Sequence, residues 1–330
     1  MTDLSSWGVA SDSPTAEHYR TFGSVEARGS SDTYEDWALG VADDAEILAL
    51  IDELPRAKRQ ANLVFAAMRV AGVPVAPWRD ARSAAIARWP RIRDIALTHA
   101  TQTNEAARCA VLLPQLARIP GPLALLEVGA SAGLCLYPDR YAYRYTSDDG
   151  TVTTLDPTEP SGVVIDCDLS DAAPPTRLPE VVWRGGIDLN PLDPADPDTL
   201  AWLDALVWPE HEDRRARLRA AMAVAASDPA PIRAGDLNDL IADAAASAPV
   251  DATLVVFHTA VLAYLSPEDR ERFRRTMADT DAVWLSNEGL GVFPEFERIV
   301  PPGERHRFVL AVDGEPVALT HPHGRSYRGL

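Results

Sequence analysis

Residues 123–133 read Leu-Ala-Leu-Leu-Glu-Val-Gly-Ala-Ser-Ala-Gly, and this stretch decides the fold that we expect. The unbroken apolar run that ends at Gly129 is typical of a parallel strand buried on both faces of a sheet. Gly129 and Gly133 allow the backbone to pass close to a ligand, and a helix that begins after them would offer free N–H groups to polar or anionic atoms. The stretch therefore predicts a strand, a glycine turn and a helix, in that order.

The glycine spacing, Glu127-x-Gly129-x-x-x-Gly133, bears on the kind of ligand. It differs from G-x-G-x-x-G, the fingerprint whose closely spaced glycines accommodate the pyrophosphate of a dinucleotide. Nicotinamide-dependent redox chemistry is therefore disfavoured. Many strand–glycine turns bind no ligand, so the motif alone leaves a binding role and a purely structural role open.

Further apolar runs follow this stretch and alternate with helical patterns. The runs are 181–189, 252–258 and 282–288, and the helical patterns are 198–207, 211–226 and 267–279. Such alternation indicates a parallel, doubly wound sheet. In 307–321 two strand-like runs flank Asp313-Gly314, a dipeptide typical of hairpin turns. We therefore predict a Rossmann-like α/β domain over 121–330, whose mostly parallel sheet ends in an antiparallel hairpin.

The chain before this domain shows helical periodicity. The predicted helices cover 43–54, 61–72 and 103–118. Pro114 is expected to kink or break the last of them, and Thr103 is a candidate N-cap. Residues 1–120 are accordingly predicted to form a helical domain that serves as a lid or binds substrate. Residues 137–180 carry a second hairpin pattern and are interpreted as a β-rich insertion near the mouth of the site.

Composition excludes several classes of function. The 330 residues carry a formal net charge of −18, which repels phosphate backbones and argues against nucleic acid as a partner. No segment approaches the roughly 20 apolar residues of a membrane span, and the N-terminal residues do not look like a secretory signal. Cys109, Cys135 and Cys167 lie far apart and are expected to be reduced thiols. These features predict a cytoplasmic protein.

Two acidic residues follow later strands. Asp188 ends the second long run in Gly-Ile-Asp-Leu-Asn-Pro, and Asp236 follows a short run that begins at Ile232. An aspartate at the carboxyl end of a neighbouring strand is well placed to accept hydrogen bonds from ribose hydroxyls, and one at the next strand from an adenine amino group. The alternative is that each simply caps a helix. An ordered series of three strand-end features is harder to obtain by chance than any one of them.

In these features and in the terminal hairpin, residues 122–330 resemble the class I S-adenosylmethionine-dependent methyltransferases. The resemblance implies that S-adenosyl-L-methionine lies against the glycine turn, that Asp188 holds its ribose and that Asp236 meets its adenine. The cofactor contacts so implied come from Glu127, Gly129, Ala130, Ser131, Gly133, Asp188, Leu189, Asp236, Leu237 and His258.

One departure from that family pattern concerns the ribose acid. In the family this acid follows the glycine turn closely, whereas here the insertion 137–180 intervenes. Glu159, Asp166 and Asp168 within the insertion are therefore alternatives to Asp188.

Nearly the whole chain also resembles a family of bacterial proteins of unknown function with this predicted fold. The resembling stretches are QTNEAARC (102–109), LLEVGASAGL (125–134), DRYAYRY (139–145), RGGIDLNPLD (184–193), VVFHTAVLAYLSPEDR (255–270) and HPHG (321–324). This second resemblance brings no established reaction.

The residues that would act on a methyl acceptor are predicted from the strand ends. His258 at the end of the fourth candidate strand is our candidate general base, since a neutral imidazole can take a proton from a hydroxyl or an amine. The alternative is a hydrogen bond to a neighbouring loop, because methyl transfer can proceed by positioning alone. The candidate acceptor-binding residues are Asn104, Glu105, Tyr143, Tyr264, Asn287 and Glu288.

Each of these also has a purely structural interpretation. Glu105 could pair with Arg108 along a helix. Tyr143 shares one strand face with Tyr141 and Tyr145 and could serve packing alone. His321 and His323 lack a third ligand nearby and are taken as turn residues, so we predict no metal site.

The sequence supports two functional hypotheses. The leading one is a methyltransferase that acts on a small molecule by O- or N-methylation. The other is a Rossmann-like protein that binds the cofactor without turnover, which the scarcity of acid/base pairs keeps open.

Overall fold

The computed structural model describes residues 14–102 and 104–330, which divide into two compact units. A helical unit contains the described residues before 103 together with Asp196–Ala216, and a sheet unit contains Asn104–Ala195 and Arg217–Leu330. The observed division differs from the predicted boundary between 120 and 121. The stretch 104–120 belongs to the sheet unit, and 196–216 belongs to the helical unit.

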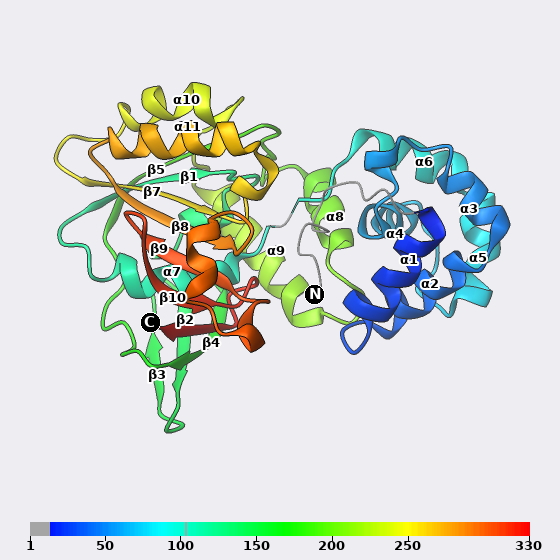
Figure 1. The fold of residues 1–330 in the computed structure, drawn as a ribbon, viewed down its shortest axis with the longest axis horizontal. Helices are drawn as coiled ribbons and strands as arrows, with labels where there is room; N and C mark the ends of the chain where they lie inside the picture. The colour runs from blue at the N-terminus through cyan, green and yellow to red at the C-terminus, as the bar shows by residue number, and fades with distance from the viewer. Residues whose placement is uncertain (1–13, 103) are drawn as a thin grey trace. The chain divides into compact units, whose positions relative to one another are not determined.

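The helical unit consists of short helices (Figure 1), and its buried side chains include the aromatic residues Tyr19, Tyr34, Trp37 and Phe65. Its elements are α1 (Thr15–Thr21), the π-helix η2 (Phe22–Ala27), α2 (Asp32–Ala42), α3 (Ala45–Ile51), the 3₁₀ turn η3 (Arg56–Lys58), α4 (Ala61–Val70), α5 (Trp78–Ala87), α6 (Trp89–Thr98) and α8 (Pro197–Leu206). Trp208 explains why the later segment packs with the N-terminal helices. Its ring lies 5.8 Å from that of Tyr34, and its indole N–H donates to Asn62 Oδ1 at 2.9 Å.

Within the described residues the strands of the sheet unit form one sheet of eleven, in the order β3-β2-β4-β11-β10-β9-β8-β7-β1-β5-β6. The strands are β1 (Leu123–Val128), β2 (Ala142–Ser147), β3 (Val152–Leu155), β4 (Val164–Ser170), β5 (Val181–Asp188), β6 (Ile232–Ala234), β7 (Thr253–Thr259), β8 (Val283–Gly289), β9 (Phe308–Val312), β10 (Glu315–Thr320) and β11 (Ser326–Gly329). In space β6, β5, β1, β7 and β8 are neighbours and parallel, and in the chain they come third, second, first, fourth and fifth. This is the doubly wound order, so the predicted Rossmann-like fold is confirmed.

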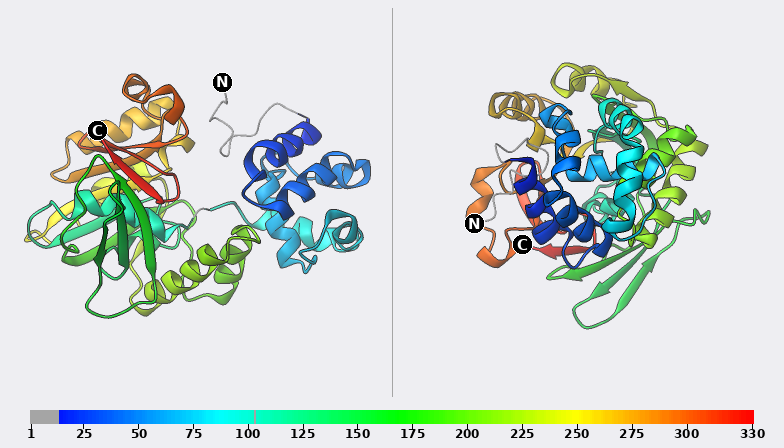
Figure 2. Two further views of the ribbon diagram at one scale, coloured as in Figure 1. Left: turned by 90° about the horizontal axis from the view of Figure 1, so that it is seen from below. Right: turned by 90° about the vertical axis from the view of Figure 1, so that its right-hand side faces the viewer.

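The hairpin predicted over 307–321 is also confirmed. Strands β9 and β10 are antiparallel, and Asp313 and Gly314 have φ angles of 51° and 84° at the turn. The prediction that this hairpin ends the sheet was wrong. β10 pairs with β11, and β11 pairs in parallel with β4 of the insertion, so that three insertion strands lie beyond the C-terminal strand (Figure 2).

Two helices, α10 (Leu237–Ala245) and α11 (Pro267–Ala278), pack on the parallel strands (Figure 1). Ile241 and Phe273 from these helices join Leu126 and Val256 in one buried core. The predicted helix at 211–226 is α9 (Glu212–Ser227), within which the boundary between the two units falls. The apolar runs and the helical periodicity therefore placed these elements correctly.

The helix predicted over 103–118 begins later than expected. It consists of the 3₁₀ turn η4 (Ala106–Arg108) and of α7 (Cys109–Leu116), and Thr103 lies outside the described residues. Pro114 lies inside α7 and does not end it. Proline cannot donate to the carbonyl four residues earlier, and the hydroxyl of Tyr145 donates to Ala110 O instead, at 2.7 Å. A side chain from β2 thus replaces the hydrogen bond that the proline removes.

Candidate functional site

The strand order reverses at β1, which makes the carboxyl ends of β1 and β7 the expected binding edge. The glycine turn 129–133 follows β1, and the loop 260–262 follows β7. Each contains a non-glycine residue with positive φ, Ser131 at 51° and Ala260 at 58°. Such conformations cost about 1–3 kcal/mol and are concentrated at functional sites. The glycine turn therefore lies at the edge of the sheet where open α/β folds generally bind ligands.

Gly129 serves the packing of these two segments against each other. A Cβ at this position would lie 2.4 Å from Cγ2 of Val261, and the residue has a φ of 73°. Close packing is thus sufficient to explain why glycine is needed here.

The helix predicted after the glycine turn is absent from the described residues, so this prediction was wrong. Gly133 leads only into η5 (Leu134–Leu136), after which the chain enters the insertion at Tyr137 and Pro138. A three-residue 3₁₀ turn has neither the length nor the row of free N–H groups of a helix terminus. The turn therefore lacks the feature with which Rossmann proteins bind a pyrophosphate.

Protein side chains occupy two amides of the glycine turn. The N–H of Ser131 donates to Asp188 Oδ2 at 2.8 Å, and the N–H of Ala132 donates to Asn104 Oδ1 at 3.0 Å. The Nδ2 of Asn104 also donates to Ser131 Oγ, at 2.8 Å. The structure thus brings together three of the predicted site residues, and it shows that Asn104 and Asp188 fix the shape of the turn.

Asp188, Leu189 and Asp236 form a continuous edge at the ends of β5 and β6, which we call the acidic edge. Asp188 pairs with Ala234 in the sheet, and the N–H of Gly235 donates to Asp188 O at 2.9 Å. Leu189, which follows Asp188, is 79% exposed. Two aspartates and an exposed leucine therefore follow neighbouring strands, and Asp188 contacts the glycine turn.

Both aspartates of the acidic edge also have local structural roles. The N–H of Asn190 donates to Asp188 Oδ1 at 2.7 Å, and the N–H of Asn238 donates to Asp236 Oδ1 at 2.8 Å. Asp236 is thereby the N-cap of α10, as in the structural interpretation of the sequence. Leu237 is the first residue of α10, and its side chain packs against the hydrophobic core of the sheet unit.

The alternative ribose acids of the insertion are remote from the glycine turn in the sheet. Asp166 and Asp168 belong to β4, and β11, β10, β9, β8 and β7 stand between β4 and β1. Glu159 is exposed in the segment that precedes β4. Neither acid of β4 therefore adjoins the glycine turn through the sheet, whereas Asp188 does. The start of the insertion does lie next to the turn, because the hydroxyl of Tyr141 donates to Leu134 O at 2.7 Å.

Glu127 is a buried carboxyl group at the end of β1. Its side chain is 5% exposed, and its Oε2 has no hydrogen-bond partner. Burial raises the pKa of this carboxyl well above its ordinary value, the neighbouring Cys135 and Asp188 raise it further, and Arg108 opposes the shift. A bound cation would stabilise the charged form of Glu127.

Arg108 is a functional candidate that sequence reasoning assigned only to a helix pair with Glu105. Glu105 pairs instead with Arg217, at 3.3 Å. The guanidinium of Arg108 donates from Nε to Pro322 O at 2.9 Å and from Nη1 to Thr259 O at 3.1 Å. It is 7% exposed, and it acts electrostatically on the buried carboxyl of Glu127. No local pattern signals this environment, because its partners come from the end of β7 and from the turn after β10, far along the chain.

His258 is not placed as a general base, which corrects the prediction. Its side chain is fully buried at 0% exposure. Its Nε2 accepts a hydrogen bond from the indole N–H of Trp284 at 3.0 Å, so the ring proton is on Nδ1, which donates to Glu288 Oε1 at 2.7 Å. Both ring nitrogens are engaged, and neither a proton acceptor nor a cofactor contact remains available.

The side chains of Glu288 and Asn287, at the end of β8, form hydrogen bonds with different partners. Glu288 Oε1 also accepts from the N–H groups of Val261 and Leu262, at 2.9 and 3.0 Å, so it holds the loop after β7. Asn287 Oδ1 accepts from Thr320 Oγ1 at 2.6 Å, and its Nδ2 has no partner. Both side chains are at most 1% exposed, so neither is presented to an acceptor molecule.

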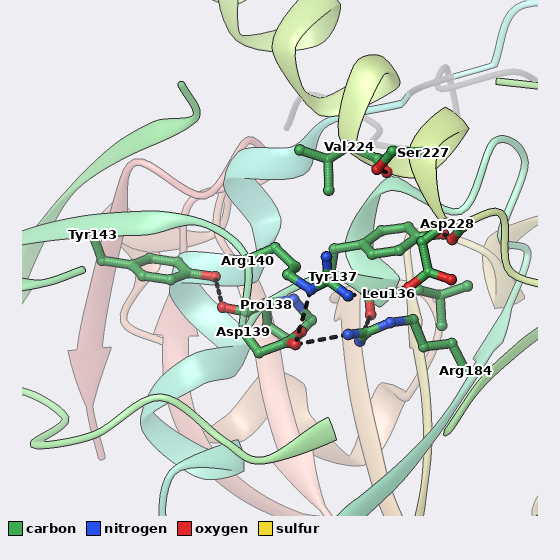
Figure 3. Close-up of polar contacts among 10 residues, drawn as sticks. All are labelled: Leu136, Tyr137, Pro138, Asp139, Arg140, Tyr143, Arg184, Val224, Ser227 and Asp228. Carbon is green, nitrogen blue, oxygen red and sulfur yellow. Dashed lines mark hydrogen bonds and ion pairs between the residues drawn. The ribbon is translucent and has the colours of Figure 1, made fainter. Parts of the chain in front are cut away.

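The two tyrosines predicted to bind the acceptor have opposite environments. Tyr264 in η6 (Leu262–Tyr264) is 67% exposed and accessible to a ligand. Tyr143 is buried in β2, and its hydroxyl donates to Pro138 O at 2.8 Å (Figure 3). Its role is therefore packing within the insertion.

The same close-up shows what ties the start of the insertion to β5. Arg184 forms a 2.7 Å ion pair with Asp139 and donates to Leu136 O at 2.6 Å (Figure 3). Its guanidinium carbon also lies 4.9 Å from the ring centre of Tyr137. This network fixes the chain immediately after the glycine turn.

The HPHG segment forms the turn between β10 and β11. Gly324 has a φ of 76°, and a Cβ there would lie 2.0 Å from Ala107 O, so the turn packs directly on η4. Burial lowers the pKa of His321 to about 4, and Arg325, Arg307 and His306 lower it further. His321 and His323 are turn residues, and no group of three metal-ligating side chains occurs in the described part of the chain.

The described residues contain neither a membrane-spanning helix nor a disulfide. None of the helices within 14–102 and 104–330 has the length and apolar character to cross a membrane. Cys109, Cys135 and Cys167 are buried and unpaired thiols. Burial raises the pKa of Cys167 to about 12, which does not favour a reactive thiolate.

Comparison with known proteins gives one match. No curated protein and no solved structure matches the chain. A family model described as "Uncharacterized protein conserved in bacteria (DUF2332)" matches residues 69–328, which include every strand of the sheet except the last residue of β11. The chain belongs to this bacterial family, DUF2332.

Proposed function

We propose that the sheet unit binds S-adenosyl-L-methionine and transfers its methyl group to a small molecule. The observation that carries the proposal is the acidic edge beside the glycine turn. Asp188 and Asp236 can accept hydrogen bonds from ribose hydroxyls and from an adenine amino group, and exposed Leu189 offers the base an apolar contact. Each carboxylate retains acceptor capacity beyond its backbone contacts.

The environment of Glu127 favours a ligand with a positive charge. Its unpartnered, buried Oε2 suits the ammonium group of the cofactor's amino-acid end, and contact with a cation would offset the cost of burying the carboxylate. The net charge of −18 also attracts a cation to the protein. By contrast, Asp188 in the glycine turn would repel a dinucleotide pyrophosphate.

The protein's own residues contribute binding and orientation. When bound, the cofactor supplies a methyl group already activated on a sulfonium, so that in-line positioning accounts for much of the acceleration. Asp188 fixes the turn after β1 through Ser131, and Glu288 fixes the loop after β7 through Val261 and Leu262. Two strand-end carboxylates thus hold the two segments between which the methyl group would be transferred.

A second candidate is a protein that binds the same nucleoside without turnover. The burial of His258 favours it, because the described residues then present no histidine base at this edge. This candidate shares the acidic edge with the first and differs only in that no methyl transfer occurs after binding.

Calorimetric titration with S-adenosylmethionine, S-adenosylhomocysteine and NADH tests both candidates. We expect the two sulfur nucleosides to bind and NADH not to bind. Formation of S-adenosylhomocysteine after addition of a bacterial metabolite extract identifies a methyltransferase, whereas binding without turnover supports the second candidate. If neither sulfur nucleoside binds, both candidates are wrong.

A further inference from the structure

We infer that Arg108 and the turn 321–325 form a subsite for a carboxylate group on the methyl acceptor. The inference rests on the proposed function and names the chemistry of its acceptor. It starts from a buried guanidinium whose hydrogen bonds all go to neutral oxygen atoms, those of Pro322 and Thr259, while the buried carboxyl of Glu127 acts on it electrostatically without a hydrogen bond. Burying a guanidinium that has no hydrogen-bonded carboxylate is costly, and an anionic ligand that pairs with it would lower that cost.

The position of Arg108 separates this subsite from the acidic edge. Its Nη1 donates to Thr259, the last residue of β7, whereas Asp188 and Asp236 follow β5 and β6. Strand β1 lies between β7 and β5 in the sheet. We therefore assign the nucleoside and the guanidinium of Arg108 to opposite sides of the glycine turn. On this assignment Arg108 binds the methyl acceptor and not the nucleoside.

The turn after β10 adds positive charge at the same place. Its Gly324 packs against Ala107, the residue before Arg108, and Pro322 O accepts from Arg108 Nε. Arg325 follows in the turn and acts electrostatically on His321, as do Arg307 and His306. Arg307 is paired with Glu304 at 2.9 Å, so exposed Arg325 supplies the added positive charge of the turn.

The neighbouring acids favour a carboxylate over a phosphate. Glu105 acts on His321, and Glu127 and Arg108 act on each other. These carboxyl groups repel a dianion more strongly than a monoanion. A guanidinium also matches the planar, two-oxygen geometry of a carboxylate.

The test uses the full chain saturated with S-adenosylhomocysteine. Acetate, benzoate and inorganic phosphate are added separately at constant ionic strength, and the midpoint of thermal unfolding is recorded. We expect the carboxylates to raise the midpoint and phosphate to have less effect. Arg108→Gln should weaken carboxylate binding at least about tenfold, as expected when a charge-assisted hydrogen bond is lost.

The matched control is Arg144→Gln, because Arg144 is an exposed arginine of β2. It should leave the response to carboxylates unchanged. If Arg108→Gln does not fold, Arg325→Gln provides a second test. Arg325 is exposed, so its substitution should leave the fold intact. It should weaken carboxylate binding severalfold, and an unchanged response would refute the subsite.

Further outcomes separate the inference from the proposed function. Loss of S-adenosylhomocysteine binding in Arg108→Gln, with binding of 5′-methylthioadenosine intact, would assign Arg108 to the cofactor's own carboxylate and overturn the inference. Stronger binding of phosphate than of acetate would also overturn it. A different result would be that wild-type protein binds benzoate but no nucleoside, and that Arg108→Gln loses the benzoate binding. The subsite would then be supported, and the proposed function would be wrong.

Discussion

Oδ2 of Asp188 accepts a 2.8 Å hydrogen bond from the N–H of Ser131, which joins the end of β5 to the turn after β1. Ser131 needs such support, because it has a φ of 51° without being glycine. One carboxylate thus shapes the turn and also belongs to the acidic edge assigned to the nucleoside. Substitutions at this residue should affect stability and binding together.

Asp188→Asn should weaken S-adenosylhomocysteine binding at least about tenfold and lower stability by about 1–2 kcal/mol, because a neutral amide is a poorer acceptor. Calorimetry and denaturant unfolding measure the two effects. Asp193→Asn is the matched control, since Asp193 also accepts from a nearby backbone amide, that of Ala195. Equal affinity of Asp188→Asn and wild type would contradict the assignment.

Leu189→Ala should separate binding from stability. The side chain is 79% exposed, so its truncation should change the free energy of unfolding by less than about 0.5 kcal/mol. Binding of S-adenosylhomocysteine should weaken severalfold because the base loses an apolar contact. Val182→Ala, at a β5 residue that is 52% exposed, should change neither quantity. Undiminished affinity in Leu189→Ala would remove this residue from the site.

Glu127→Gln should change how stability depends on pH. The native carboxyl has a raised pKa, so above the ordinary value of 4.5 the native state holds more protons than the unfolded state, and stability falls as pH rises. The glutamine variant lacks this fall and should be the more stable protein at pH 8, by about 1–3 kcal/mol. Denaturant unfolding from pH 5 to pH 8 measures the difference, and parallel curves for the two proteins would refute the prediction.

The same substitution should weaken binding of S-adenosylmethionine more than binding of the unsubstituted nucleoside adenosine. Only the former carries an ammonium group for the carboxylate to receive. Affinity of wild-type protein for S-adenosylmethionine should rise with pH, since binding a cation at Glu127 releases its proton. Glu268→Gln, at an exposed acid in the first turn of α11, provides the control.

Gly129→Ala should destabilise the protein by about 1–3 kcal/mol, because the added Cβ overlaps Val261 and the backbone has a positive φ. Adding Val261→Ala relieves the overlap but not the strain, so the double variant should recover part of the loss relative to Val261→Ala alone. A double-mutant cycle measures this coupling. Simple additivity of the two substitutions would show that the contact is not responsible.

Glu288→Gln should act on stability rather than on a chemical step. It removes the charged partner of His258 Nδ1 and weakens the support of the loop that begins at Ala260. We expect a loss of about 1–3 kcal/mol, because the amide oxygen is a poorer acceptor than the carboxylate for the three hydrogen bonds. His258→Gln should likewise lower the thermal midpoint. A His258 variant of wild-type stability that lacks methyl transfer would restore histidine as the base.

The sequence was most informative where local pattern and tertiary structure agree. The apolar run 123–128 is buried along its whole length, and Asp313-Gly314 adopts the backbone that a two-residue hairpin requires. β11 was not recognised, because Ser326–Gly329 is short and lacks apolar alternation. Its existence depends on neighbours on both sides, which no local pattern encodes.

The candidate site was predictable only in its outline. Strand ends place Asp188, Asp236 and the glycine turn at one edge, as expected. The environment of His258 depends on Trp284, which lies on the neighbouring strand and blocks the ring nitrogen that catalysis would need. Arg108 acquires its partners from Thr259 and Pro322, far along the chain. Side-chain partners of this kind follow from the tertiary fold and not from spacing.

The pairing of β4 with β11 has a consequence for how the protein is made. During synthesis Val164–Ser170 leaves the ribosome long before Ser326–Gly329, its neighbour in the finished sheet. Until then β4 presents an open row of backbone donors and acceptors on that side, the kind of edge that recruits strands from other chains. Holdase chaperones that shield such edges should therefore improve the yield of nascent protein more than its refolding from dilute denaturant.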